Sequence, residues 1–76
     1  MINELDTIVL SHDVEPYGLE KGDIGAVVHV YKDEAAYEVE FVTGEGETVA
    51  VLTLTLEDIR PMSEREILHV RELITA

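Results

Sequence analysis

The chain has 76 residues, which is enough for one domain and too few for two. Its 17 Asp and Glu against 5 scattered Lys and Arg give a formal net charge of −12, so we expect neither nucleic acid nor membrane as a partner, because both are bound through clusters of basic residues. With no cysteine, no leader-like opening and no apolar run near the roughly 20 residues of a membrane span, the sequence indicates a cytoplasmic protein.

A short β-rich run from Leu5 to Leu10 predicts the first strand. The turn formers of residues 11–18 come next without periodicity and indicate a loop. Residues 19–25 predict a turn in which Gly22 supplies a positive φ angle and Gly25 a bend or bulge as the next strand begins.

Two further strands are expected over residues 24–31 and 36–42, joined by a four-residue loop. This loop length sets Val30 opposite Tyr37 and Val28 opposite Val39, so that apolar residues meet on one face. The agreement between loop length and pattern favours this register.

A second hairpin is expected to turn at residues 45–46 and to continue as a strand over residues 49–56. A two-residue loop sets Phe41 opposite Ala50 and Val39 opposite Leu52. A loop longer or shorter by one residue would exchange the two faces of this strand. The strand is apolar on both faces, which is typical of a strand covered on both sides.

The two registers divide the apolar residues between two faces. The predicted core comprises Leu5, Ile8 or Val9, Ile24, Val28, Val30, Tyr37, Val39, Phe41, Leu52 and Leu54. The outer face is predicted to carry Val27, Val42, Val49 and Val51. Four valines are too many to leave exposed on so small a domain, so we expect this patch to be covered.

The last part of the chain predicts a very short strand around Ile59 and Arg60, followed by a helix. Ser63 and Glu66 have the spacing of a capping box, and the apolar residues after them recur with helical period. An isolated helix this short is marginal in water, so its apolar stripe is expected to dock on the outer valines, in the same chain or across a homodimer. The stripe comprises Ile67, Leu68, Val70, Leu73 and Ile74.

Five short strands with a long first loop are the order of an SH3-like barrel. The segments Glu4–Leu10, Lys21–Gly25, Tyr37–Phe41 and Asp58–Pro61 resemble more closely a family of short bacterial proteins described only as a domain of unknown function. The resemblance covers residues 2–62 and implies a small SH3-like barrel in the bacterial cytoplasm, with no activity. The expected fold is therefore mainly β: a five-stranded SH3-like barrel over residues 1–62 with one C-terminal amphipathic α-helix, residues 63–76, that is not a separate domain.

Three polar groupings are candidates for chemistry. One histidine and two carboxylates within residues 12–15 could hold a metal, but turn-forming polarity explains them equally well. His29 opposite Glu38 could form an acid–base pair, and Glu38 with Glu40 could form paired carboxylates. A barrel this small has no cleft to perturb such groups, so an exposed, solvated face is the favoured interpretation. We expect no catalytic residue, no metal, no cofactor and no enzyme.

The predicted function is a non-catalytic protein-interaction module that self-associates as a homodimer. Tyr17 and Leu19 lie on the long first loop, where SH3-like barrels often bind partners, although such residues also tuck under the loop as a satellite core. Two alternatives remain: an acidic inhibitor or antitoxin-like partner of a basic protein, and an accessory domain of a multi-subunit enzyme. The predicted partner-binding residues are Tyr17, Leu19, Val27, Val42, Val49, Val51, Ile67, Leu68, Val70, Leu73 and Ile74.

Overall fold

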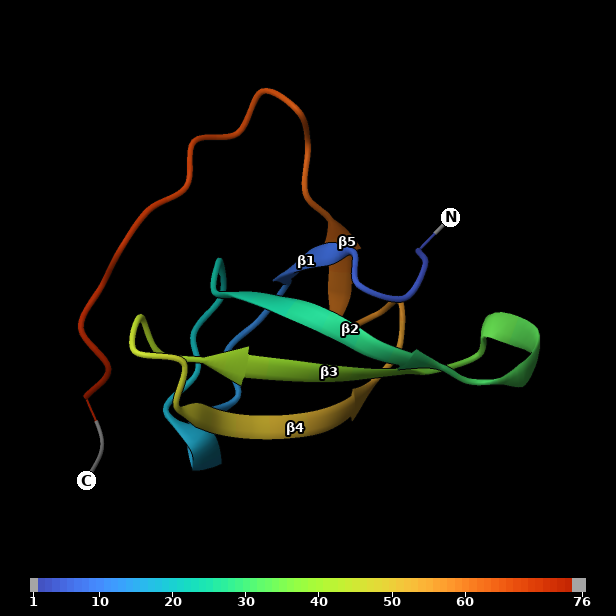
Figure 1. Cartoon of the computed structure of the whole chain (residues 1–76), viewed down its shortest axis with the longest axis horizontal. Helices are drawn as coiled ribbons and strands as arrows, with labels where there is room; N and C mark the ends of the chain where they lie inside the picture. Colours follow the sequence, from blue (N-terminus) through green and yellow to red (C-terminus); the bar gives the residue numbers. More distant parts are fainter. Residues whose placement is uncertain (1, 75–76) are drawn as a thin grey trace.

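The computed structural model describes residues 2–74 and shows one antiparallel sheet of five strands (Figure 1). The strands lie in the order β4-β3-β2-β1-β5, so β4 and β5 are its two edges. Two 3-10 turns, η1 and η2, interrupt the connections. The elements are β1 (Thr7–Leu10), η1 (Glu15–Tyr17), β2 (Ile24–Val30), η2 (Lys32–Glu34), β3 (Tyr37–Val42), β4 (Thr48–Leu54) and β5 (Ile59–Pro61).

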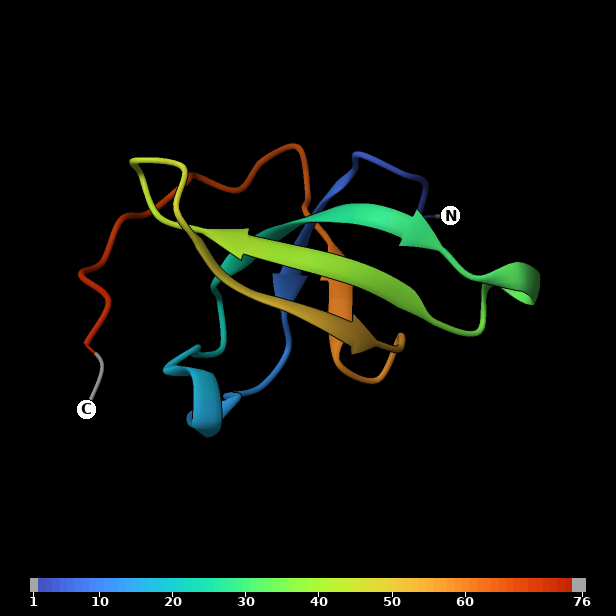
Figure 2. The ribbon, with the colours of Figure 1, turned by 60° about the horizontal axis from the view of Figure 1, so that its bottom comes forward.

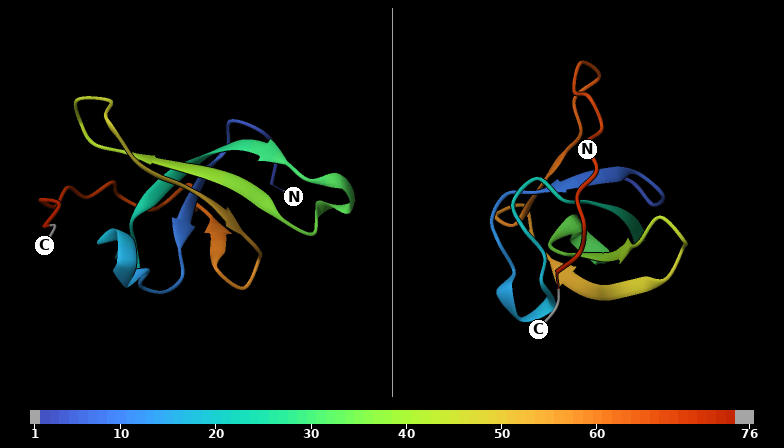
Figure 3. Two further views of the ribbon diagram at one scale, coloured as in Figure 1. Left: turned by 90° about the horizontal axis from the view of Figure 1, so that it is seen from below. Right: turned by 90° about the vertical axis from the view of Figure 1, so that its left-hand side faces the viewer.

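The sheet bends so that β1 and β5 run across the direction of β3 and β4 (Figures 2 and 3). The side chains enclosed by this bend form a single core, in which Ile8, Val27 and Val39 have no exposed surface. All buried core residues lie between Ile2 and Ile59, so the described part of the chain after β5 contributes none of them. The mainly β, five-stranded prediction agrees with this arrangement.

The hairpin of β2 and β3 has the predicted register at its loop end and is shifted by one residue from Val27 toward the start of β2. His29 pairs with Glu38 and Val30 with Tyr37, as predicted, but Val27 rather than Val28 pairs with Val39. Val28 is the extra residue of a β-bulge, and a bulge exchanges the two faces of the strand beyond it. Val27 is therefore buried while Val28 and Ile24 are exposed, so the predicted core assignment of Val28 and Ile24 was wrong.

The hairpin of β3 and β4 has the predicted pairs Phe41 with Ala50, Val39 with Leu52 and Tyr37 with Leu54. Its loop is one residue longer than expected, because the N–H of Gly46 donates to the carbonyl of Thr43 at 2.9 Å and Gly46 has a φ of 86°. A β-bulge in β4 compensates for the added loop residue: Val42 pairs with Thr48, and Val49 has no partner in β3. The two irregularities cancel, and the predicted register holds from Ala50 onward.

Leu5 was predicted to begin the first strand and to enter the core, and both expectations were wrong. It lies in a turn with a φ of 73° and its side chain is 84% exposed. The turn is stabilised by Asp6, whose carboxylate accepts from the N–H of Asn3 at 2.8 Å and whose N–H donates to the carbonyl of Asn3 at 3.1 Å. Such local bonds compete with strand pairing, and Ile2 occupies the core instead.

The predicted C-terminal helix is absent, and the fold class was wrong in this respect. The capping box does form a turn: the N–H of Ser63 donates to Glu66 Oε1 at 2.7 Å, and the N–H of Glu66 donates to the carbonyl of Ser63 at 3.1 Å. No helix continues from it through residue 74, and residues 75 and 76 of the prediction lie outside the described part. Twelve residues with three β-branched apolar side chains form a marginal helix, and contacts of Glu66 and Arg71 with the sheet domain prevail over it.

Within residues 2–74, no helix is long and apolar enough to cross a membrane.

Candidate functional site

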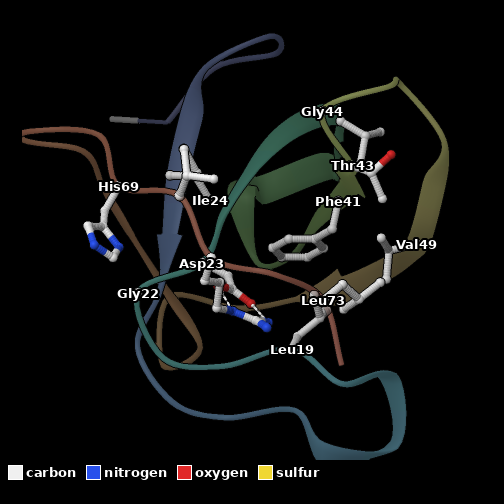
Figure 4. Close-up of a pocket in the computed structure, with 13 residues that line it drawn as sticks. Leu19, Gly22, Asp23, Ile24, Phe41, Thr43, Gly44, Val49, His69 and Leu73 are labelled. Carbon is white, nitrogen blue, oxygen red and sulfur yellow. Dashed lines mark hydrogen bonds and ion pairs between the residues drawn. The ribbon is translucent and has the colours of Figure 1, made fainter. Parts of the chain in front are cut away.

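Residues 62–74, here called the C-terminal tail, leave β5 and return across the start of β2 toward the end of β3 (Figure 1). Between the tail and the sheet lies a groove of about 360 Å³. Its apolar lining from the sheet domain is Leu19, Ile24, Phe41, Val42 and Val49, and Leu73 of the tail lies against it (Figure 4).

One end of the groove is an acidic clasp, formed by Asp23, the carbonyl of Gly18 and the carboxylate of Glu20. It holds the guanidinium of Arg71. Arg71 Nε donates to Asp23 Oδ1 at 2.8 Å, and Nη2 donates to Asp23 Oδ2 at 2.5 Å and to the Gly18 carbonyl at 2.8 Å. Glu20 Oε2 lies 3.7 Å from Nη1. This fork-to-carboxylate geometry is the arrangement in which arginine binds most specifically.

The turn that carries the clasp is fixed by its own backbone. The N–H of Asp23 donates to the Glu20 carbonyl at 2.9 Å, the N–H of Glu20 donates to Asp23 Oδ2 at 2.8 Å, and Gly22 has a φ of 96°. The side chain of Asp23 is only 18% exposed. This burial raises the pKa of Asp23, but hydrogen bonds from Arg71 and from the N–H of Glu20, with the positive charge of the guanidinium, lower it below 3.8. Asp23 is therefore charged at neutral pH.

The tail binds as an extended segment whose side chains alternate. Arg71 and Leu73 are partly buried at the groove, whereas Val70, at its rim, and Ile74 are 90% and 79% exposed. Along the described part of the tail, the turn at Ser63 has the only backbone-to-backbone hydrogen bond. The tail is thus held by side chains at two-residue spacing, as extended peptides are in side-chain pockets.

A second ion pair fixes the start of the tail. Arg60 of β5 donates from Nη1 and Nη2 to the two carboxylate oxygens of Glu66, at 2.9 and 2.7 Å. The hydrogen bonds from Arg60, followed by that from the N–H of Ser63, lower the pKa of Glu66 to about 2. The pair is close to half exposed, so it directs the tail rather than adding much stability.

The structure brings five of the predicted partner-binding residues to the groove and separates the others. Leu19, Val42, Val49, Val70 and Leu73 all line it, with Leu19 buried, as the satellite-core interpretation had it. Val27 lies in the core, so its placement on the outer face was wrong and the four valines form no common patch. The remaining predicted residues are exposed: Tyr17 and Ile74 beside Thr48 at the rim of a neighbouring hollow, Val51 on β4, and Ile67 and Leu68 on the tail.

The other polar candidates have local partners. His12 Nε2 lies 2.8 Å from Asp58 Oδ1 and Nδ1 lies 2.9 Å from the Asp13 carbonyl, and both contacts raise the pKa of His12 above 6.5, that with Asp58 the more. Glu38 accepts hydrogen bonds from Tyr31 and Thr53. Within residues 2–74, no three His, Asp or Glu side chains gather as a metal would require.

Sequence reasoning missed the acidic clasp. The clasp joins Arg71 to Asp23, which lies 48 positions earlier in the chain. The helical spacing of the apolar residues around Arg71 had placed it on the predicted helix. One signal was present: Arg71 lies two residues before Leu73, and in an extended chain this spacing puts both on one side.

The site is thus a groove on a small antiparallel β domain, apolar along its length and acidic at one end. A family model described as Domain of unknown function (DUF4926) matches residues 4–61, and the chain belongs to this family. Comparison with curated proteins and with solved structures gave no match. The sheet-domain residues of the groove lie inside the matched range, whereas the tail that lines its other side lies outside.

Proposed function

We propose that this protein is a non-catalytic protein-interaction module whose groove binds an extended segment bearing an arginine and, two residues later, an apolar side chain. The observation that carries the proposal is the docking of Arg71 in the clasp and Leu73 against the groove. The tail acts here as an occupant in cis, on a groove that belongs to the family domain.

The charge distribution supports this choice of partner. With a net charge of −12, the chain attracts basic segments over a distance and repels acidic ones. A guanidinium bound by a largely buried carboxylate and a backbone carbonyl gives specificity that a surface charge does not. The apolar lining beyond the clasp then discriminates among arginine-containing segments by the side chain two residues after the arginine.

An SH3-like fold and a cytoplasmic location in bacteria belong to the same proposal. The strand order, the long connection between β1 and β2 and its placement beside the groove support the first. The absence of cysteine and the resemblance to short bacterial proteins support the second.

The test uses the full chain with Arg71→Gln and Leu73→Ser, which weakens the tail's hold while every buried core residue stays in place. A labelled peptide with the sequence of residues 66–74 is titrated and binding is measured by fluorescence anisotropy. We expect binding, weakened about tenfold or more when the peptide's arginine becomes glutamine, because a charge-assisted hydrogen bond contributes about 1.5–3 kcal/mol.

Two further variants in the same background locate the binding. Asp23→Asn should weaken peptide binding as much as replacing the arginine of the peptide does. Asp33→Asn removes an equal charge in the distant β2–β3 loop and should leave the affinity unchanged. Equal binding of both peptides, or equal affinities of the two variants, would overturn the proposal.

A further inference from the structure

The two edges of the sheet differ in how they are protected. The β5 edge is three residues long and contains Pro61, which has no N–H, and Arg60, which is tied to Glu66. The β4 edge is seven residues long, Thr48–Leu54, and contains no charged residue, proline or glycine. Natural sheets shield exposed edges by short length, proline, charged side chains and bulges, and of these β4 has only the bulge at Val49, next to its first residue.

The outward backbone of β4 is unpaired within the described chain. Every backbone hydrogen bond of residues 2–74 outside the strand ladders involves other segments, and β4 pairs only with β3. Alternate residues of an edge strand direct their N–H and C=O groups away from the sheet. Val51, at the middle of the strand, is 47% exposed.

The side chains around the edge favour an uncharged partner strand. Glu38 and Glu40 lie on β3, one strand further in, opposite Thr53 and Val51. Their carboxylates already accept from Thr53 Oγ1 at 2.6 Å and from Thr48 Oγ1 at 2.7 Å. β4 itself carries no charged side chain, so a strand added at this edge lies directly beside threonine and apolar side chains only.

We propose that β4 is a self-association surface, where β4 of a second copy adds antiparallel and joins the two sheets into one. Val51 is the midpoint of Thr48–Leu54, so a two-fold axis through it pairs Val51 with its own copy and Ala50 with Leu52 of the second copy. Facing residues of an antiparallel pair lie on the same face, so the central residues Ala50, Val51 and Leu52 meet apolar side chains, while Thr53 faces Val49 and Thr48 faces Leu54. The surface is distinct from the groove.

The net charge does not prevent this pairing. The Glu38 and Glu40 rows of the two copies would lie three strand spacings apart, about 14 Å at about 4.8 Å per spacing. That exceeds the Debye length of about 10 Å at 0.1 M salt. Each copy carries a net charge of −12, so added salt should strengthen self-association by screening the remaining repulsion, opposite to its effect on a complex held by charge attraction.

Sedimentation equilibrium of the full chain, from micromolar to near-millimolar concentration and at two salt concentrations, tests the proposal. We expect a monomer–dimer equilibrium that shifts toward dimer with salt. Val51→Lys sets two like charges opposite each other and should weaken the dimer about tenfold or more. Val28→Lys is the control, because it adds the same charge at a 43% exposed position on β2, away from the β4 edge and outside the groove.

Both lysine variants should keep the melting temperature of the original, since both side chains are exposed. A chain that stays monomeric throughout would overturn the proposal, as would equal weakening by Val51→Lys and Val28→Lys. Arg71→Gln should leave the dimer unchanged. Loss of the dimer in this variant would show that copies associate by exchanging tails instead, and would leave the groove's peptide binding intact as a separate result.

Discussion

Gly25 is the position where a single methyl group should have the largest structural effect. A Cβ built on it would lie 2.7 Å from Val39 Cγ1, 2.9 Å from Phe41 Cε2 and 3.0 Å from the carbonyl oxygen of Glu40. Val39 and Phe41 are buried, and the carbonyl belongs to the β3 backbone. None of these atoms can move away without disturbing the core or the strand ladder.

The magnitude of Gly25→Ala results from two opposing effects. Overpacking of a well-packed core costs about 1–3 kcal/mol. Loss of glycine's freedom in the unfolded chain offsets about 0.4–1 kcal/mol where the backbone suits alanine. We expect a net loss of about 1–2 kcal/mol, which in a domain this small lowers the melting temperature by about 5–15 °C.

Thermal unfolding monitored by far-UV circular dichroism measures this, with urea unfolding as a second readout. Gly44→Ala is the matched control, because a Cβ there has nothing within 4 Å. It should be neutral or slightly stabilising. If Gly25→Ala unfolds at the temperature of the original while Gly44→Ala behaves as expected, the close approach of β2 to β3 is incorrect.

Three further predictions concern charge and burial. Val39→Asp should leave the domain unfolded at room temperature by circular dichroism, because an unpaired charge in the core exceeds the stability of so small a domain; a folded variant would contradict the register of β3. The pKa of His12 is raised, so its contribution to stability is present below pH 6.5 and lost as pH rises through the raised value; the melting-temperature difference between the original and His12→Ala should shrink over that range. The pKa of Asp23 is lowered, so tail docking should persist at neutral pH and be lost as pH falls below 3.8. The NMR chemical shift of Leu73, followed over this pH range, should report the loss; a shift that stays constant would contradict the prediction.

Sequence reasoning succeeded where pattern and turn length constrain each other. The pairs from Phe41 with Ala50 to Tyr37 with Leu54 are dictated by alternation in two facing strands. It failed at Val28, where a bulge inserted one residue and exchanged the faces of the first half of β2. A bulge here has no mark in the local sequence, since both neighbours of Val28 fit a strand, and only the packing of Val27 against the core selects it.

The tail shows the limit of local propensity. Ser63 and Glu66 were correctly paired from the sequence, but they form a single turn where the start of a helix was predicted. The conformation of the chain after this turn depends on contacts that local pattern does not contain, above all the bond of Arg71 with Asp23. Helix formation over twelve residues contributes little by itself, so two ion pairs with the sheet domain decide the conformation.

The groove depends on the same irregularities that defeated the sequence prediction. The bulge at Val28 turns Val27 into the core and leaves Ile24, at the start of β2, on the groove side. The bulge at Val49 sets this side chain, left over from the pairing of Val42 with Thr48, half-buried beside Leu73. In strands without bulges, the side chains of Ile24 and Val49 would each point to the other face of the sheet from the one they occupy. Irregularities of this kind recur where a sheet presents side chains to a ligand, and their coincidence with the acidic clasp is a physical reason to look for a binding partner at this end of the sheet.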